Sequence, residues 1–282
     1  MRICQWHVTV LGLICSATFA AGAKIEVMPG PGTPLQDAID AAPATGATLL
    51  LQEGTYNEAV TIDKRLTIRL APGAASGAGI NAGCMSPDAL RITADGVRIL
   101  GTISVAGGTA RQVVIENADS VRLERVSGRD TCGMGGIGLA VTASDRVKVS
   151  RGQFRAGGTA CLIEGIGLGS KVLLDGANCL ADGLSPAGVG VHFKDCGNGA
   201  LAPGRGGVRM KRSQFFPAVQ GEARGIILEN SDGVSIEYVQ IRVNDAPDSK
   251  RLDIDATSGG VGNCYTNCKT FFVPPLGMSL CQ

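Results

Sequence analysis

The chain has 282 residues, including 41 glycines and 10 cysteines, and only 4% of its residues are aromatic. Its 26 lysines and arginines almost balance 25 aspartates and glutamates, which leaves no basic excess to hold a nucleic acid. No apolar run approaches the roughly 20 residues of a transmembrane helix, so we expect no membrane span.

The first 23 residues have the pattern of an export signal. Arg2 supplies a positive charge, residues 8–14 a short apolar core, and Ala21-Gly22-Ala23 the small residues of a cleavage site. Cleavage near Ala23 predicts a secreted or periplasmic protein. Because it removes Arg2, the mature chain would carry 25 basic and 25 acidic groups.

Export also changes the cysteine count. Loss of Cys4 and Cys15 leaves eight cysteines, and an even number in an exported chain predicts disulfides. The pairing stays open, although Cys132, Cys161 and Cys179 fall on successive units of the repeat described below and are candidate partners. A zinc site is the alternative, because the spacing of Cys264 and Cys268 has some ligand character.

Residues 33–42 predict a short helix. Thr33 is suited to the N-cap, Pro34 to the first helical turn, and Gln36 to a capping box. One helix face collects the apolar side chains of Leu35, Ala38, Ile39 and Ala42. We expect this helix to close an otherwise open end of the fold.

A short phrase recurs along the rest of the chain, most clearly as Ala94-Asp95-Gly96-Val97-Arg98-Ile99. It returns at residues 118–123 and 144–149, and apolar residues alternate with polar ones, as they do in a strand. A period in the twenties indicates a solenoid. The valine slot is occupied, at steps of 24, 26, 25, 36 and 26 residues, by Val97, Val121, Val147, Val172, Val208 and Val234.

A second strand follows each valine by seven residues. Its central residues, expected to stack inward, are Phe154, Cys179, Phe215 and Ile241. With short strands, glycine or aspartate at the corners and no helix inside the period, the fold class is all-β: a right-handed parallel β-helix of about seven turns over residues 24–245. A leucine-rich repeat lacks support, because its asparagine or cysteine signature is missing. Residues 246–282 are predicted to form a disulfide-rich C-terminal cap.

The order of capping helix, apolar strand and the motif Gly54-Thr55-Tyr56-Asn57-Glu58-Ala59-Val60 resembles the pectate lyase and pectinesterase superfamily. The resemblance covers roughly residues 33–245 and implies a β-helix that acts on carbohydrate. The catalytic blocks of that superfamily are missing from this sequence: the paired aspartates with glutamine and arginine, and the Trp-x-Asp-His block. No catalytic residue is therefore carried over.

Outward side chains at equal offsets from the valine should form columns about 4.8 Å apart. Amide and arginine side chains suit the hydroxyls and carboxylates of a glycan. The candidate substrate-binding residues are Arg129, Gln153, Arg155, Gln214, Gln240 and Arg242. Asp130 and Asp182, about 10 Å apart by this register, are candidate catalytic carboxylates that could bracket a glycosidic bond or a calcium ion; both could instead be turn residues.

His192 is the one histidine that remains after export, and with Lys194 it is a candidate for acid–base chemistry. Lys194 would serve as a base if its surroundings lowered its pKa. Both fall in an expected inserted loop, residues 185–204, within the 36-residue step. The aspartates of the repeat are predicted to be structural, bonding the turn backbone: Asp95, Asp119, Asp145 and Asp232.

Together these features predict an exported polysaccharide-acting protein, a lyase or epimerase on a uronic-acid-containing chain. Calcium is a candidate cofactor, an acidic polysaccharide the expected partner, and a monomer the expected state. The alternative is a non-catalytic β-helix on the cell surface that binds a glycan or a protein. The missing catalytic blocks favour the second hypothesis, and the expected loop and arginine-aspartate patch favour the first.

Overall fold

The structure is a computed structural model. It describes residues 22–133, 135–167, 169–183, 187–197, 208–215, 218–219, 222–241, 250–254, 264–266 and 279–280. Most of the predicted signal peptide and most of the predicted C-terminal cap lie outside these residues, and both stay predictions.

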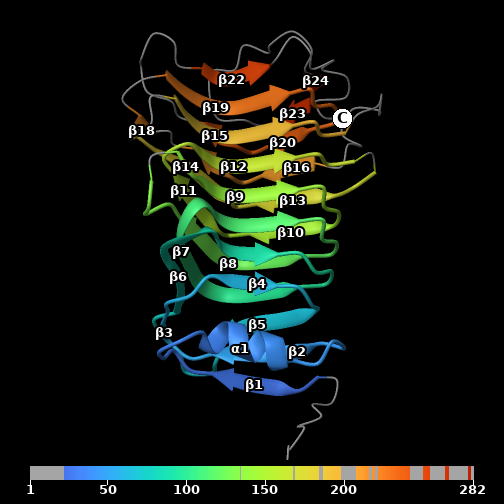
Figure 1. Cartoon of the computed structure of the whole chain (residues 1–282). Coiled ribbons are helices and arrows are strands. Elements are labelled where there is room, and N and C mark those ends of the chain that lie inside the picture. The colour runs from blue at the N-terminus through green and yellow to red at the C-terminus, as the bar shows by residue number, and fades with distance from the viewer. Residues whose placement is uncertain are drawn as a thin grey trace, which may run out of the picture.

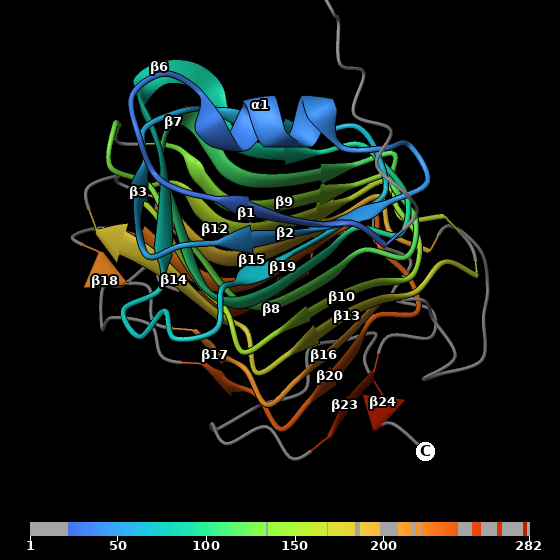
Figure 2. The same cartoon turned by 90° about the horizontal axis from the view of Figure 1, so that it is seen from below.

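The chain winds into a coil of parallel strands stacked along one axis, with the N-terminal strand at one end (Figure 1). The strands form three faces, and viewed along the axis the faces surround a common interior (Figure 2). The predicted parallel β-helix is confirmed. The number of turns stays a prediction, because the C-terminal part includes residues outside the described ranges.

The face that begins at the repeat valines is called the valine face. Two long strands contribute only their first residues to this face and then continue into the next face: β7 (Arg98–Glu116) and β8 (Arg122–Arg129). The other strands are β1 (Lys24–Val27), β2 (Ala47–Leu51), β5 (Leu66–Leu70), β10 (Val147–Ser150), β13 (Val172–Asp175), β16 (Val208–Lys211), β20 (Ser235–Glu237), β23 (Cys264–Thr266) and β24 (Ser279–Leu280).

The second face, called the glutamine face, holds the column that begins at Gln153. It contains the start of β6 (Ala78–Ile92), the middle of β7 and the end of β8. Its remaining strands are β3 (Gly54–Tyr56), β11 (Gln153–Ala156), β14 (Asn178–Gly183), β17 (Gln214–Phe215) and β21 (Gln240–Ile241), and β18 (Ala218–Val219) pairs with the end of β14.

The third face, called the histidine face, carries His192. It contains the ends of β6 and β7. Its other strands are β4 (Val60–Ile62), β9 (Ile137–Thr142), β12 (Thr159–Glu164), β15 (Ala187–Lys194), β19 (Glu222–Glu229) and β22 (Lys250–Ile254).

The registers confirm the predicted columns. Val147 pairs with Val172, which pairs with Val208, and all three side chains are buried. Phe154 pairs with Cys179 on the next turn, and both are fully buried. The core is therefore a set of apolar stacks running along the axis, in which each turn covers the apolar surface of the one before.

Helix α1 (Pro34–Ala41) lies at the N-terminal end beside β1 and β4 (Figure 1). Its buried Leu35 and Ile39 belong to the core, so the helix helps to close that end, as expected. The predicted capping box is wrong, because Thr33 caps no backbone N–H with its side chain. Instead, both carboxylate oxygens of Glu58 accept bonds from the N–H groups of Leu35 (2.9 Å) and Gln36 (2.8 Å). The cap comes from a residue 23 positions away, which a local motif cannot reveal.

The motif around Glu58 is thus structural. Tyr56 is fully buried, and its hydroxyl donates to the carbonyl oxygen of Val27 at 2.7 Å. Burial raises the pKa of Tyr56 to about 12. The motif ties β1, α1 and the first turns of the coil together.

Replacing Glu58 with alanine should lower the free energy of unfolding by about 2–3 kcal/mol. The change would leave two helix N–H groups without their acceptor in a site where Glu58 is only 4% exposed. Urea denaturation followed by circular dichroism measures the loss. Glu53→Ala is the control, because the Glu53 carboxylate accepts only exposed bonds. An equal effect of both changes would contradict the capping role.

The corner before the valine face carries a ladder of aspartates. One carboxylate oxygen of each accepts the backbone N–H of the next turn: Asp95 from Asp119 (2.7 Å), Asp119 from Asp145 (3.2 Å) and Asp145 from Lys171 (2.7 Å). The predicted structural role of these three repeat aspartates is confirmed.

Among the described residues, two disulfides link neighbouring parts of the coil. Cys161 bonds Cys179, as the adjacency of their turns suggested, and Cys84 bonds Cys132. Cys196 is reduced and fully buried, and burial raises the pKa of its thiol to about 11. The side chains of the C-terminal cysteines lie outside the described part of the chain.

The Cys196 thiol should therefore be inert in the folded protein. Thiol reagents react with thiolate, which is scarce at neutral pH when the pKa is raised and burial blocks access. We expect Cys196 to be labelled only after urea unfolding, as mass spectrometry of the labelled peptide would show. Rapid labelling of this peptide in buffer would contradict the buried position.

Candidate functional site

The predicted binding column on the glutamine face forms as a register. Gln153 pairs with Asn178, Gln214 pairs with Gln240, and Arg155 lies between Arg129 and Leu180. The Asn178 side-chain oxygen accepts the N–H of Gln214 at 3.2 Å, so this oxygen is already used within the sheet. Arg242 lies outside the described residues. Binding by this column stays a prediction.

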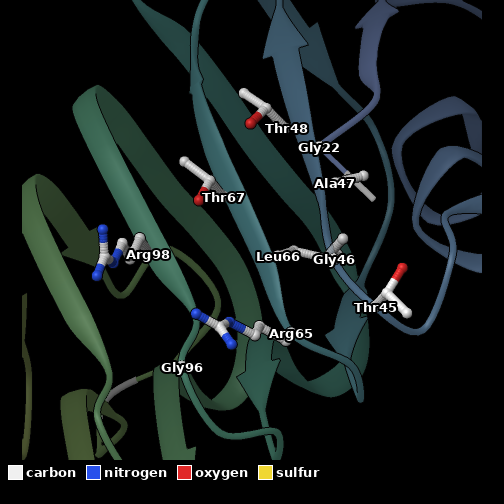
Figure 3. Close-up of a pocket in the computed structure, with 10 residues that line it drawn as sticks. All are labelled: Gly22, Thr45, Gly46, Ala47, Thr48, Arg65, Leu66, Thr67, Gly96 and Arg98. Atoms are coloured by element: carbon white, nitrogen blue, oxygen red, sulfur yellow. The ribbon is translucent and has the colours of Figure 1, made fainter. Parts of the chain in front are cut away.

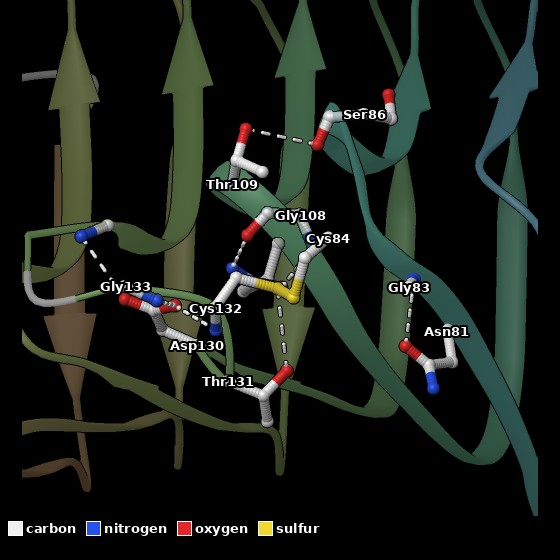
Figure 4. The surroundings of a disulfide bond; sticks show 12 residues. Asn81, Gly83, Cys84, Ser86, Gly108, Thr109, Asp130, Thr131, Cys132 and Gly133 are labelled. Atoms are coloured by element: carbon white, nitrogen blue, oxygen red, sulfur yellow. Dashed lines mark hydrogen bonds between the residues drawn. A yellow bond between two sulfur atoms is a disulfide. The ribbon is translucent and has the colours of Figure 1, made fainter.

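Asp130 lies at the corner that follows β8 (Figure 4). Its carboxylate accepts three backbone N–H groups, from Cys132 (3.1 Å), Gly133 (3.2 Å) and Gly136 (3.2 Å). These bonds fix the turn next to the Cys84–Cys132 disulfide and give Asp130 a structural function. Asp182 lies on β14, two turns further on as predicted, and only its backbone is described. A catalytic role for either residue stays a prediction.

The expected loop at His192 is wrong. Residues 187–194 form strand β15, which pairs in register with β12 and β19 inside the histidine face. The valine spacing showed that extra residues lie between Val172 and Val208, but it could not locate them. His192 is thereby held on a rigid sheet.

His192 lies in a small network of charged groups on the outer surface of the histidine face. Its Nε2 is 2.8 Å from an oxygen of Glu229, and its side chain is only 19% exposed. Lys194, the next outward residue of β15, has its ammonium group 3.1 Å from Glu164. We call these four residues the His192 cluster.

The surroundings of the cluster are apolar on both sides of the histidine. The register places His192 between Leu162 on β12 and Ile227 on β19. A neutral imidazole that donates Nε2–H to Glu229 keeps Nδ1 as an acceptor. This is the arrangement of a histidine oriented by a carboxylate.

Lys194 is a fixed cation in this cluster. Its hydrogen bond to Glu164, reinforced by the negative charge of Glu229, raises the pKa of the ammonium group above its usual value. It therefore stays protonated at neutral pH. The sequence hypothesis that Lys194 could be a base required the opposite shift.

The candidate catalytic residues are not all brought together. Asp130 and Asp182 lie at the corner between the glutamine and histidine faces, whereas Lys194 ends β15 at the opposite edge of the histidine face. His192 and Lys194 share the outward surface of β15. Among the described residues, no group of three or more histidine, cysteine, aspartate or glutamate side chains is placed to hold a metal ion.

Sequence reasoning missed a group of cations on the valine face. Arg98, Arg122 and Lys148 pair in register as one outward column. The polar slot of the repeat phrase, directly after each valine, was the available signal. By itself that slot indicates only strand alternation.

No protein-family model matches this sequence, and no curated protein matches it. In the described part of the chain, no helix has the length and apolar character needed to cross a bilayer.

Solved structures of low identity are similar over most of the chain. An alginate lyase from Paenibacillus sp. str. FPU-7 has a TM-score of 0.48 at 14% identity, covering 88% of this chain and 99% of that one. A rhamnogalacturonan lyase has a TM-score of 0.47 at 11% identity, with 83% and 86% covered. The pectin methylesterase from Aspergillus niger has a TM-score of 0.42 at 14% identity, with 91% and 92% covered. The likeness concerns the fold alone.

Proposed function

We propose that this protein is exported and acts on a uronic-acid-containing polysaccharide, with the His192 cluster as its site of β-elimination. One observation supports this most directly: a half-buried histidine bonded at 2.8 Å to Glu229 lies two residues from a lysine that keeps its proton. The pair supplies an acceptor for a proton and a positive charge on the same surface.

The chemistry requires both groups. The hydrogen on C5 of a uronate is acidified by the neighbouring carboxyl group, and a nearby cation lowers the energy of the anion that forms. The Nδ1 atom of His192 would take this proton while Glu229 holds Nε2–H. Electrons of the C5–H bond form the C4–C5 double bond, the C4–O bond breaks, and water protonates the leaving oxygen.

Lys194 would pair with the uronate carboxylate. Alternate residues of a strand are about 7 Å apart on one face, a distance that one sugar ring and its carboxylate can span. Lys194 would then contact both Glu164 and the substrate carboxylate. Return of the proton to C5 from the opposite side, without loss of the C4 oxygen, would instead give an epimer.

The test is the ultraviolet absorbance of the unsaturated uronide during incubation of the secreted, oxidised protein with pectic, alginate and glycosaminoglycan chains. Each chain is assayed with and without calcium, since calcium stays a candidate cofactor. We expect absorbance to rise with at least one chain. No rise with any chain would refute the lyase, and a change of uronate configuration by NMR without absorbance would identify an epimerase.

The same samples distinguish an enzyme from the non-catalytic alternative, a protein that only binds the polysaccharide. Retention of the protein on an immobilised polysaccharide, with no change of the chain by absorbance or NMR, would favour a binding protein. Loss of turnover in a variant that still binds would favour the enzyme.

A further inference from the structure

A second charged surface lies on the valine face, away from the His192 cluster. Two adjoining surface hollows share Arg65, Gly96 and Arg98. One of them, of about 380 Å³, is also lined by Asp95, Asp119, Ser120 and Arg146. Figure 3 shows the other, where Thr48, Thr67 and Arg98 project from neighbouring strands and the Arg65 guanidinium lies beside Gly96.

The sheet register makes these side chains a continuous line. Thr48 pairs with Thr67, Thr67 with Arg98, Arg98 with Arg122, and Arg122 with Lys148. Neighbouring parallel strands are about 4.8 Å apart, so two hydroxyl groups are followed along the axis by three evenly spaced cations. We call Arg65, Arg98, Arg122, Arg146 and Lys148 the cationic groove.

In the part of the chain that the structure describes, three of these cations lack a carboxylate partner. Within the described residues, Arg65, Arg98 and Lys148 form no ion pair, and all three are exposed. On later turns of the same face the arginines are neutralised instead. Arg209 bonds Glu237 at 2.6 Å, and Arg212 binds both carboxylate oxygens of Asp175, at 2.6 and 2.7 Å.

The neighbouring carboxylates are engaged within the fold. Asp95 and Asp119 each accept a backbone N–H from the next turn, and Asp119 also contacts Arg146 at 3.3 Å. Glu124 holds Arg122 at 2.8 Å and Arg151 at 2.6 Å, and the bond from Arg122 lowers its pKa. The positive charge of the unpaired cations is thus left for a ligand.

We propose that the cationic groove binds a carboxylated polysaccharide whose chain runs along the axis of the coil. Arginine holds carboxylates with two parallel hydrogen bonds, and a column of cations matches a chain that repeats its acidic group. Thr48, Thr67 and the second carboxylate oxygen of Asp95 can bind sugar hydroxyls. Among the described residues that line the hollows none is aromatic, so the groove offers no platform for stacked nucleobases.

This surface is independent of the proposed catalytic site, because it lies on different strands and needs no turnover. It would give the protein a second point of attachment to an acidic matrix. A chain held at two sites dissociates more slowly than one held at either.

The experiment measures binding of polygalacturonate to the full protein by isothermal titration calorimetry at low salt. The double variant Arg98→Gln/Lys148→Gln should weaken binding by about tenfold, equivalent to one lost charge-assisted bond. The matched control is Arg209→Gln/Arg212→Gln, which removes the same charge from the same face but from paired groups, and it should change the affinity less than about twofold.

Three results would overturn the proposal. Equal losses in the two double variants would show a general charge effect. Absence of polygalacturonate binding would show that the groove does not bind the proposed ligand. Equally tight binding of single-stranded DNA would show that the surface binds any polyanion. If the protein degrades polysaccharide but fails these binding tests, the proposed function stands and only the proposal about the groove is refuted.

Discussion

Replacing His192 with glutamine is expected to reduce the rate of β-elimination roughly 10²–10⁴-fold, the usual contribution of a general acid–base group. Glutamine keeps a polar side chain of similar length, so the contact with Glu229 can persist while the basic nitrogen is lost. The rate is measured as ultraviolet absorbance on whichever acidic chain the wild-type protein degrades. The thermal unfolding midpoint should stay close to that of the wild type.

Two further variants make the His192 result specific. Thr142→Ala changes the same outward column as Lys194, two turns earlier, and should retain most of the activity. Glu229→Gln should cause a smaller loss and shift the pH profile, because Glu229 acts by positioning the imidazole. Full activity of His192→Gln would refute the proposed base, whatever the other variants do.

Replacing Phe154 with alanine is expected to lower the free energy of unfolding by about 3–5 kcal/mol. The side chain is fully buried and occupies a space bounded by glycines. A Cβ on Gly128 or Gly152 would come within 3.2 or 2.9 Å of the ring, and one on Gly138 within 3.1 Å of the Phe154 Cβ. Because glycines have no side chain to move inward, the cavity would stay open.

Urea denaturation of the oxidised protein measures the Phe154 effect. Phe154→Leu fills most of the space and should cost clearly less. Tyr238→Ala is the matched aromatic control: Tyr238 is 58% exposed, so its loss should change stability by less than about 0.5 kcal/mol. Similar losses for Phe154→Ala and Tyr238→Ala would contradict the glycine-bounded core.

The repeat could be predicted closely because its cause is local. A parallel coil places residues at equal offsets on top of one another, so the valine spacing alone determined the stack of Val147, Val172 and Val208. The same argument placed Asp95 and Asp119 at a corner, where their carboxylates bond the next turn. The period made Cys132, Cys161 and Cys179 candidate partners but left the pairing open, and the structure joins Cys161 to Cys179 and Cys84 to Cys132.

The site depended on tertiary contacts. Glu58 caps a helix 22 to 23 residues earlier, and Glu229 meets His192 across 37 residues, so neither partner follows from the neighbouring sequence. The coil and its inward columns could be predicted, because strand alternation and a fixed period are properties of the chain. That His192 lies on a strand, and that Arg98 and Lys148 form no ion pair within the described residues, depends on which residues of other turns come within reach, so neither could be predicted.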